Sequence, residues 1–213
     1  MPAETKISVV SVVVLGAFAP PTFHPSWFAR NNLLASAEAD AAVIEIVHTD
    51  VAIFKTEWLV VNAAQDKFSV TCTRDDSIPL LADLVIGVFQ ILSQSPVRAF
   101  GINREIHFQM GSVEEWHEIG HRYAPKECWK GILESPGMLA VHMQGAREDG
   151  RPGKINILIQ PSDRVSHGAF VRVNDHYDLA SNTLAEEGLK DIRSLWSSSL
   201  ERSLNMATKL VTL

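Results

Sequence analysis

The sequence predicts an α+β protein made of two similar halves with mainly antiparallel sheets, and three observations support this prediction. Apolar and polar residues alternate over short segments, as they do in half-buried strands. Other segments are longer, with apolar residues at helical spacing. The order strand, helix, three strands, helix occurs on both sides of Ser95 and Pro96. We therefore expect halves at residues 1–95 and 96–213, packed together as one compact unit, and we infer an internal duplication as a hypothesis.

The first expected strand covers residues 6–18, which are apolar at nearly every position. Such a run is typical of a central strand that is buried on both faces. The run and its Ala17-Phe-Ala19 ending also resemble a secretory signal peptide. Its β-branched valines and the following Pro20 favour the buried strand.

The remaining elements follow from the same two periodicities, with prolines and glycines between them. In the first half we expect a helix at 26–37, strands at 43–47, 52–61 and 68–73, and a helix at 78–92. In the second half we expect a strand at 98–110, a helical region at 113–133 that is broken near Ala124, strands at 138–143, 155–160 and 169–173, and a last helix at 184–210.

Composition and charge restrict the partners of this chain. Its 213 residues are 46% hydrophobic and 21% charged, as in ordinary globular proteins. A formal charge of −6 without a run of Lys and Arg argues against a nucleic-acid partner. No apolar run reaches the roughly 20 residues of a membrane span, so no membrane partner is expected. Cys72 and Cys128 are too few for a disulfide framework and predict free thiols in the cytoplasm.

One string matches a catalytic motif: His117 and His121 enclose Glu118 in the pattern His-Glu-x-x-His. On a helix, histidines four residues apart share a face and can bind one zinc ion, while the intervening glutamate acts as general base. Glu127 follows His117 by ten residues, a spacing that resembles the third zinc ligand of metzincin proteases. This pattern predicts, as one alternative, a zinc-dependent hydrolase or peptidase.

The surrounding residues favour a different interpretation. Ser112 and Glu115 form a capping box, so His117 falls in the second turn of a short helix. Glu114 makes the start of this helix more polar than a zinc-protease helix, and Ala124 stands where metzincins have glycine. A solvated, partly packed helix without a cofactor is the favoured interpretation.

Other polar residues are weaker candidates for a functional site. His24 and Trp27 lie near the first helix, where the core or a pocket could hold them. Arg104 and Glu105 occupy adjacent, opposite-facing positions of a strand. Either one of them points inward and has a function, or the strand is an edge or solvent-facing strand with both exposed. Residues 174–178 are predicted to form a turn or helix cap, and residues 147–151 a solvated hairpin loop.

Two segments carry a resemblance. They are Gly16-Ala-Phe-Ala-Pro20 with Phe23-His-Pro-Ser-Trp-Phe28, and Gly120-His-Arg-Tyr-Ala-Pro-Lys-Glu-Cys-Trp129. The chain resembles an uncharacterised family of bacterial hypothetical proteins that open with a strand and a Phe-x-Pro-x-Trp-Phe segment. The resemblance covers about a third of the chain and implies a bacterial, soluble origin without an activity.

The sequence thus favours a non-enzymatic binding or interaction protein: a sensor, an adaptor or a subunit of an assembly, with a protein partner or self-association. Two alternatives remain. One is the zinc hydrolase, with Glu118 as base and His117, His121 and Glu127 as ligands. The other is a small-molecule sensor with a pocket between the two halves. The residues of such a pocket are not predicted.

Overall fold

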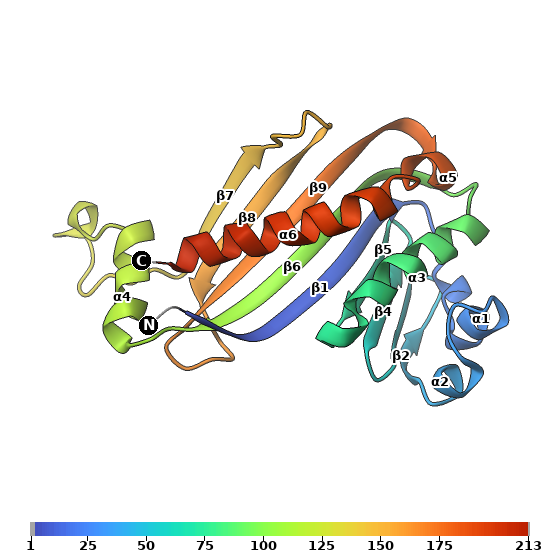
Figure 1. The fold of residues 1–213 in the computed structure, drawn as a ribbon, viewed down its shortest axis with the longest axis horizontal. Coiled ribbons are helices and arrows are strands. Elements are labelled where there is room, and N and C mark those ends of the chain that lie inside the picture. The colour runs from blue at the N-terminus through green and yellow to red at the C-terminus, as the bar shows by residue number, and fades with distance from the viewer. Residues whose placement is uncertain (1–2, 213) are drawn as a thin grey trace.

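Within residues 3–212, which the computed structural model describes, nine strands form one open antiparallel sheet. The strand order is β2-β3-β4-β5-β1-β6-β9-β8-β7, and Figure 1 shows β1 beside β6. The predicted α+β class with antiparallel strands is confirmed, but the two halves share one sheet. The strands are β1 (Glu4–Gly16), β2 (Val43–Val47), β3 (Val51–Lys55), β4 (Leu59–Ala64), β5 (Lys67–Cys72), β6 (Pro96–Gln109), β7 (Val141–Ala146), β8 (Gly153–Pro161) and β9 (Gly168–Leu184).

The two longest helices lie across one face of this sheet, as Figure 1 shows for α3 and α6. The small helices α1 and α2 lie at the end of the molecule near β2, and α4 lies at the other end (Figure 1). The helices are α1 (Pro25–Arg30), α2 (Ser36–Asp40), α3 (Ile78–Ile91), α4 (Val113–Tyr123), α5 (Ala185–Gly188) and α6 (Ile192–Val211), with single 3-10 turns η1 (Pro20–Thr22), η2 (Asp75–Ser77) and η3 (Glu127–Trp129).

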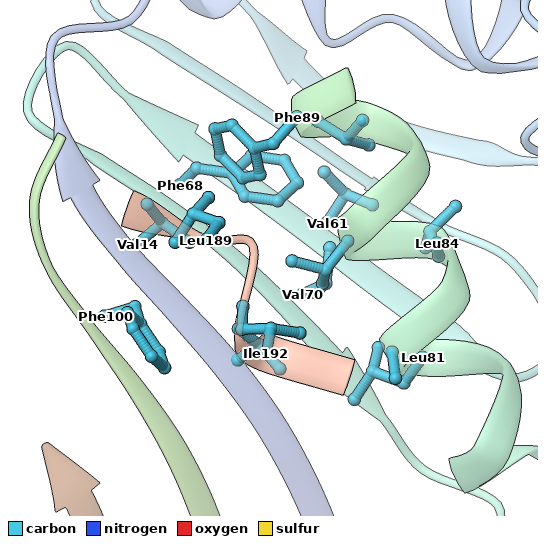
Figure 2. Packing of buried hydrophobic residues seen from close by; sticks show 14 of the residues in the cluster. Val14, Val61, Phe68, Val70, Leu81, Leu84, Phe89, Phe100, Leu189 and Ile192 are labelled. Atoms are coloured by element: carbon cyan, nitrogen blue, oxygen red, sulfur yellow. The ribbon is translucent and has the colours of Figure 1, made fainter. Parts of the chain in front are cut away.

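The main core lies between the sheet and these helices. Side chains of α3 point toward the sheet, and the residues that join α5 to α6 and begin α6 meet them there (Figure 2). The labelled members are Val14, Val61, Phe68, Val70, Leu81, Leu84, Phe89, Phe100, Leu189 and Ile192. Since they come from both halves of the chain, the halves share one hydrophobic core.

The central strand β1 is covered on one face only. Val10, Val12 and Val14 are fully buried beneath the helices, whereas Ser11 and Val13 on the other face are half-buried. The expected strand is confirmed, but its burial on both faces is wrong, because the helices that contact the sheet gather on one side. The opposite side is called the open face below.

Two elements that the sequence predicted in the first half, a helix and a strand, are each interrupted in the structure. The helix expected at 26–37 stops after Arg30, because Asn32 adopts a left-handed φ of 56°. The strand expected at 52–61 is the hairpin of β3 and β4, closed by the Thr56 N–H that donates to the Leu59 carbonyl at 2.9 Å. Four strands therefore follow α2, whereas three follow α4, and the internal duplication stays a prediction.

In the second half, β9 is the largest departure from the expected bounds. It runs from Gly168 to Leu184, beyond the expected residues 169–173, because it pairs with β6 from Gln109 to Pro96. The expected helical region 113–133 is α4 followed by η3, and the last helix is divided into α5 and α6.

Two further predictions concern membrane-spanning segments and the thiols. No helix in the described range is both long and apolar enough to cross a membrane. Cys72 is buried, Cys128 is exposed, and both are free thiols, as the sequence predicted.

Candidate functional site

The histidine motif lies on α4, and the expected cap begins this helix. The Glu115 N–H donates to Ser112 Oγ at 3.2 Å, and the Gly111 N–H donates to the Glu115 carboxylate at 3.0 Å. Trp116 attaches the helix to the sheet, since its indole N–H donates to the Gly168 carbonyl at 3.1 Å. Tyr123 donates to the Leu210 carbonyl of α6 at 2.8 Å.

His117 and His121 face one pocket of about 280 Å³ between α4, the 135–138 segment and the start of β9. Glu118 and Glu127 are exposed and do not line it, whereas Lys126 does. Among residues 3–212, no group of three or more His, Cys, Asp or Glu is arranged to hold a metal ion. The structure thus brings two of the three predicted zinc ligands to one pocket without the third, and the zinc hydrolase stays a prediction.

His24 and Trp27 have structural contacts. His24 caps α1, because its Nδ1 accepts from the Ser26 N–H at 3.2 Å. The Trp27 ring packs against Phe23 and Phe28, with ring centroids 6.0 and 5.2 Å away. Both positions agree with the interpretation that this aromatic cluster belongs to the core.

Arg104 and Glu105 point to opposite faces of β6, as predicted. Arg104 lies beneath α6 and donates to Ser203 Oγ at 3.3 Å and to Ser8 Oγ at 3.2 Å. Burial lowers the pKa of this guanidinium from its ordinary value. Glu105 instead lines a groove on the open face.

The predicted hairpin loop at 147–151 is confirmed, since these residues join β7 to β8, but its first residue is buried and not solvated. The predicted turn at 174–178 is wrong, because these residues lie within β9. Arg147 is buried and donates to the carboxylate of Asp175, which lies within β9. The guanidinium also stacks on the Tyr177 ring, 3.7 Å from its centroid. Asp175 accepts further hydrogen bonds from Ser199 at 2.6 Å and Arg202 at 2.6 Å, both on α6. We call Arg147, Asp175, Tyr177, Ser199 and Arg202 the buried clamp, because it ties the β7–β8 hairpin and β9 to α6.

The open face carries an extended polar site. A groove of about 660 Å³ crosses β1, β6, β9, β8 and β7, which lie side by side in Figure 1. Strand register places one polar side chain from each of these strands in a single row across the groove. The row consists of Ser11, Asn103, Asn174, Asn156 and Gln144. We call these five residues the amide row.

Hydrogen bonds within the amide row join its ends but not its centre. Gln144 Nε2 donates to Asn156 Oδ1 at 2.8 Å, and Asn103 Nδ2 donates to Ser11 Oγ at 3.3 Å. Asn103 is only 6% exposed, yet its Oδ1 finds no partner among the described residues. The Oδ1 of Asn174, directly opposite on β9, is buried without a partner in the same part of the chain.

An amide end without a partner costs free energy in a folded protein. A buried polar group that makes no hydrogen bond costs about 1–3 kcal/mol. Turning the Asn103 amide around would let its oxygen accept from Ser11 but would leave its NH₂ without a partner. The centre of the amide row is therefore chemically incomplete in either orientation.

Charges of both signs lie beside this centre. Glu105 on β6 is directly opposite Arg172 on β9, and both line the groove. Within residues 3–212, neither side chain forms an ion pair. The site can thus offer hydrogen-bond acceptors, a carboxylate and a guanidinium to one ligand.

Comparison with known proteins adds no assignment, since neither a protein-family model nor a curated protein sequence matches this chain. Sequence reasoning missed the amide row, although a signal for it exists. Ser11 and Asn156 each stand between two apolar residues, which is unusual for a polar side chain in a strand. The strand order and register that align these residues are properties of the folded sheet.

Proposed function

We propose that this chain is a non-enzymatic binding protein that holds a small polar ligand in the open-face groove. The observation that carries the proposal is the buried Asn103 amide, whose Oδ1 lacks a partner at the centre of the amide row. A ligand N–H or O–H that reached this oxygen would recover the free energy that the unpaired group costs.

The groups nearest this amide support binding rather than chemistry. The hydroxyl of Ser11 and the amides of Asn174 and Asn156 can donate and accept hydrogen bonds but do not titrate near neutral pH. Glu105 and Arg172 add opposite charges across two neighbouring strands. These features favour a small zwitterion with donor groups, such as an amino acid or a short peptide.

The groove also fits a sensor whose site joins the two parts of the chain. Ser11 and Val13 come from residues 1–95, while the other lining residues come from residues 96–213. A sensor or adaptor in the cytoplasm is the role we propose for such a site.

The test is calorimetry of the full chain against amino acids and short peptides, with neutral sugars of similar size for comparison. We expect Asn103→Leu to weaken zwitterion binding by about 1–3 kcal/mol, or roughly fivefold to 150-fold. Asn62→Leu is the matched control, because Asn62 lies on the open face outside the groove. Equal affinity of Asn103→Leu and the wild type would reject the site, and stronger binding of the sugars would reject the ligand class.

A further inference from the structure

The outer edge of β7 lacks the features that usually protect an edge strand. Among the described residues, β7 pairs only with β8, so every second backbone N–H and C=O points away from the sheet. Exposed edges are normally blunted by charged residues, proline or a bulge. The segment Val141-His-Met-Gln-Gly-Ala146 contains no charged residue and no proline, and its register with β8 is regular throughout.

Exposed apolar side chains accompany this edge. Met143 is 64% exposed, and Leu139, two residues before the strand, is 88% exposed. Ile132 and Leu133 in the segment between η3 and β7 are exposed as well. An edge of this kind gains stability when another strand adds to it.

We infer that a second copy of this chain pairs with β7, antiparallel and centred on Met143. A two-fold axis perpendicular to the sheet would place Met143 opposite its own copy. His142 would then lie opposite Gln144, and Val141 opposite Gly145. Alternation along the strand keeps partners on the same face, so the two Met143 side chains meet on one face and His142 meets Gln144 on the other.

The polarity of β7 is what favours a second copy over an unrelated strand. Apolar, polar and apolar positions are arranged almost symmetrically about Met143, and no like charges would meet across the axis. Pairing would also place His142 of one copy beside Gln144 of the other. The amide row would then continue from one groove into the next, since both open faces lie on the same side.

The test is sedimentation velocity of the full chain over a concentration series, with a reductant because Cys128 is an exposed thiol. We expect a dimer that forms with increasing concentration. Met143→Lys should raise its dissociation constant by about tenfold or more, since two lysines would then lie opposite each other and the apolar contact is lost. Met143 is exposed, so this variant should keep the wild-type circular dichroism and midpoint of thermal unfolding.

Ile44→Lys is the matched control, because Ile44 is an exposed apolar residue on the opposite edge strand, β2. Dimerisation that Met143→Lys weakens and Ile44→Lys leaves unchanged supports the inference. A wild-type chain that stays monomeric at the highest concentration overturns it. So does a dimer that is weakened by Ile44→Lys alone, or growth without limit into filaments.

Discussion

Asn174 and Asp175 are neighbours on β9, yet their surroundings differ completely because their side chains leave opposite faces of the sheet. Asp175 is 1% exposed and accepts hydrogen bonds from Arg147, Ser199, Arg202 and Tyr177. The Oδ1 of Asn174 is also buried, and it has no partner within residues 3–212.

The difference separates two uses of a buried polar group. On the covered face, α6 brings donors to Asp175, so the carboxylate stabilises the position of the helix. On the open face, no helix supplies donors, and the Oδ1 atoms of Asn103 and Asn174 have no partner among the described residues. A buried polar group without a partner lowers the stability of the fold, so each one needs an explanation, and the proposed ligand supplies one for Asn103 and Asn174.

Removal of the charge at Asp175 should have the largest effect on stability. Asp175→Asn leaves the guanidinium groups of Arg147 and Arg202 beside a neutral amide in a buried site. We expect the free energy of unfolding to fall by about 3–5 kcal/mol. Asn174→Ala on the other face should not lower it, because the buried Oδ1 that this change removes has no partner among the described residues. Urea denaturation measures both, and equal losses would remove the distinction between the two faces.

An apolar residue at the centre of the amide row should change the free energy of unfolding in the opposite direction and stabilise the fold. Asn103→Leu removes a buried amide oxygen that lacks a partner, together with the hydrogen bond from Nδ2 to the half-buried Ser11. We expect the free energy of unfolding to rise by about 1 kcal/mol, because the buried unpaired oxygen costs more than that bond contributes. Urea denaturation without ligand is again the measurement. A loss as large as that of Asp175→Asn would mean that the Asn103 amide stabilises the fold and is not kept for a ligand.

Removal of one donor from the buried clamp should be milder than removal of its acceptor. Tyr177→Phe deletes the hydroxyl that donates to Asp175 at 3.2 Å and accepts from Arg202 at 3.2 Å, and it keeps the ring that stacks on Phe100. We expect a loss of about 1–3 kcal/mol for these two hydrogen bonds. A double-mutant cycle with Asp175→Asn should show coupling, and additive effects would argue that the two residues act separately.

His107 supplies a pH-dependent comparison on the open face, where it is buried but has a partner. Its Nδ1 lies 2.8 Å from Ser162 Oγ, and its ring packs on Phe170. Burial lowers the pKa of His107 from its ordinary value of 6.5; nearby Arg164 adds to this, while Asp163 and Glu105 oppose it.

The unfolded chain therefore binds a proton on this histidine more readily than the folded chain. The stability that His107 contributes is complete above pH 6.5 and is lost as the pH falls below that value, toward the lowered folded-state pKa. His107→Phe should reduce this loss between the two pKa values, as measured by urea denaturation at a series of pH values. An unchanged slope in His107→Phe would contradict the assignment.

Local sequence signals predicted the elements that depend on near neighbours. The valine-rich segment predicted β1, the apolar segment at 78–92 predicted α3, and Ser112 with Glu115 predicted the start of α4. Contacts between residues far apart in the chain left no such signal in the sequence. Arg147 stands in a loop-like string of charges, and only the return of β9 and α6 around it makes a buried ion pair possible.

The sequence by itself determined the class of fold, the central position of β1, the cap of α4 and the free state of both thiols. Each of these follows from alternation, spacing or composition within a short stretch of chain. Only the tertiary structure decided that both halves share one sheet, that helices cover a single face, and that Asn103 and Asn174 meet in one row. The reason is that strand order and register join residues far apart in the chain, and a shift of one residue would send every side chain of a strand to the other face.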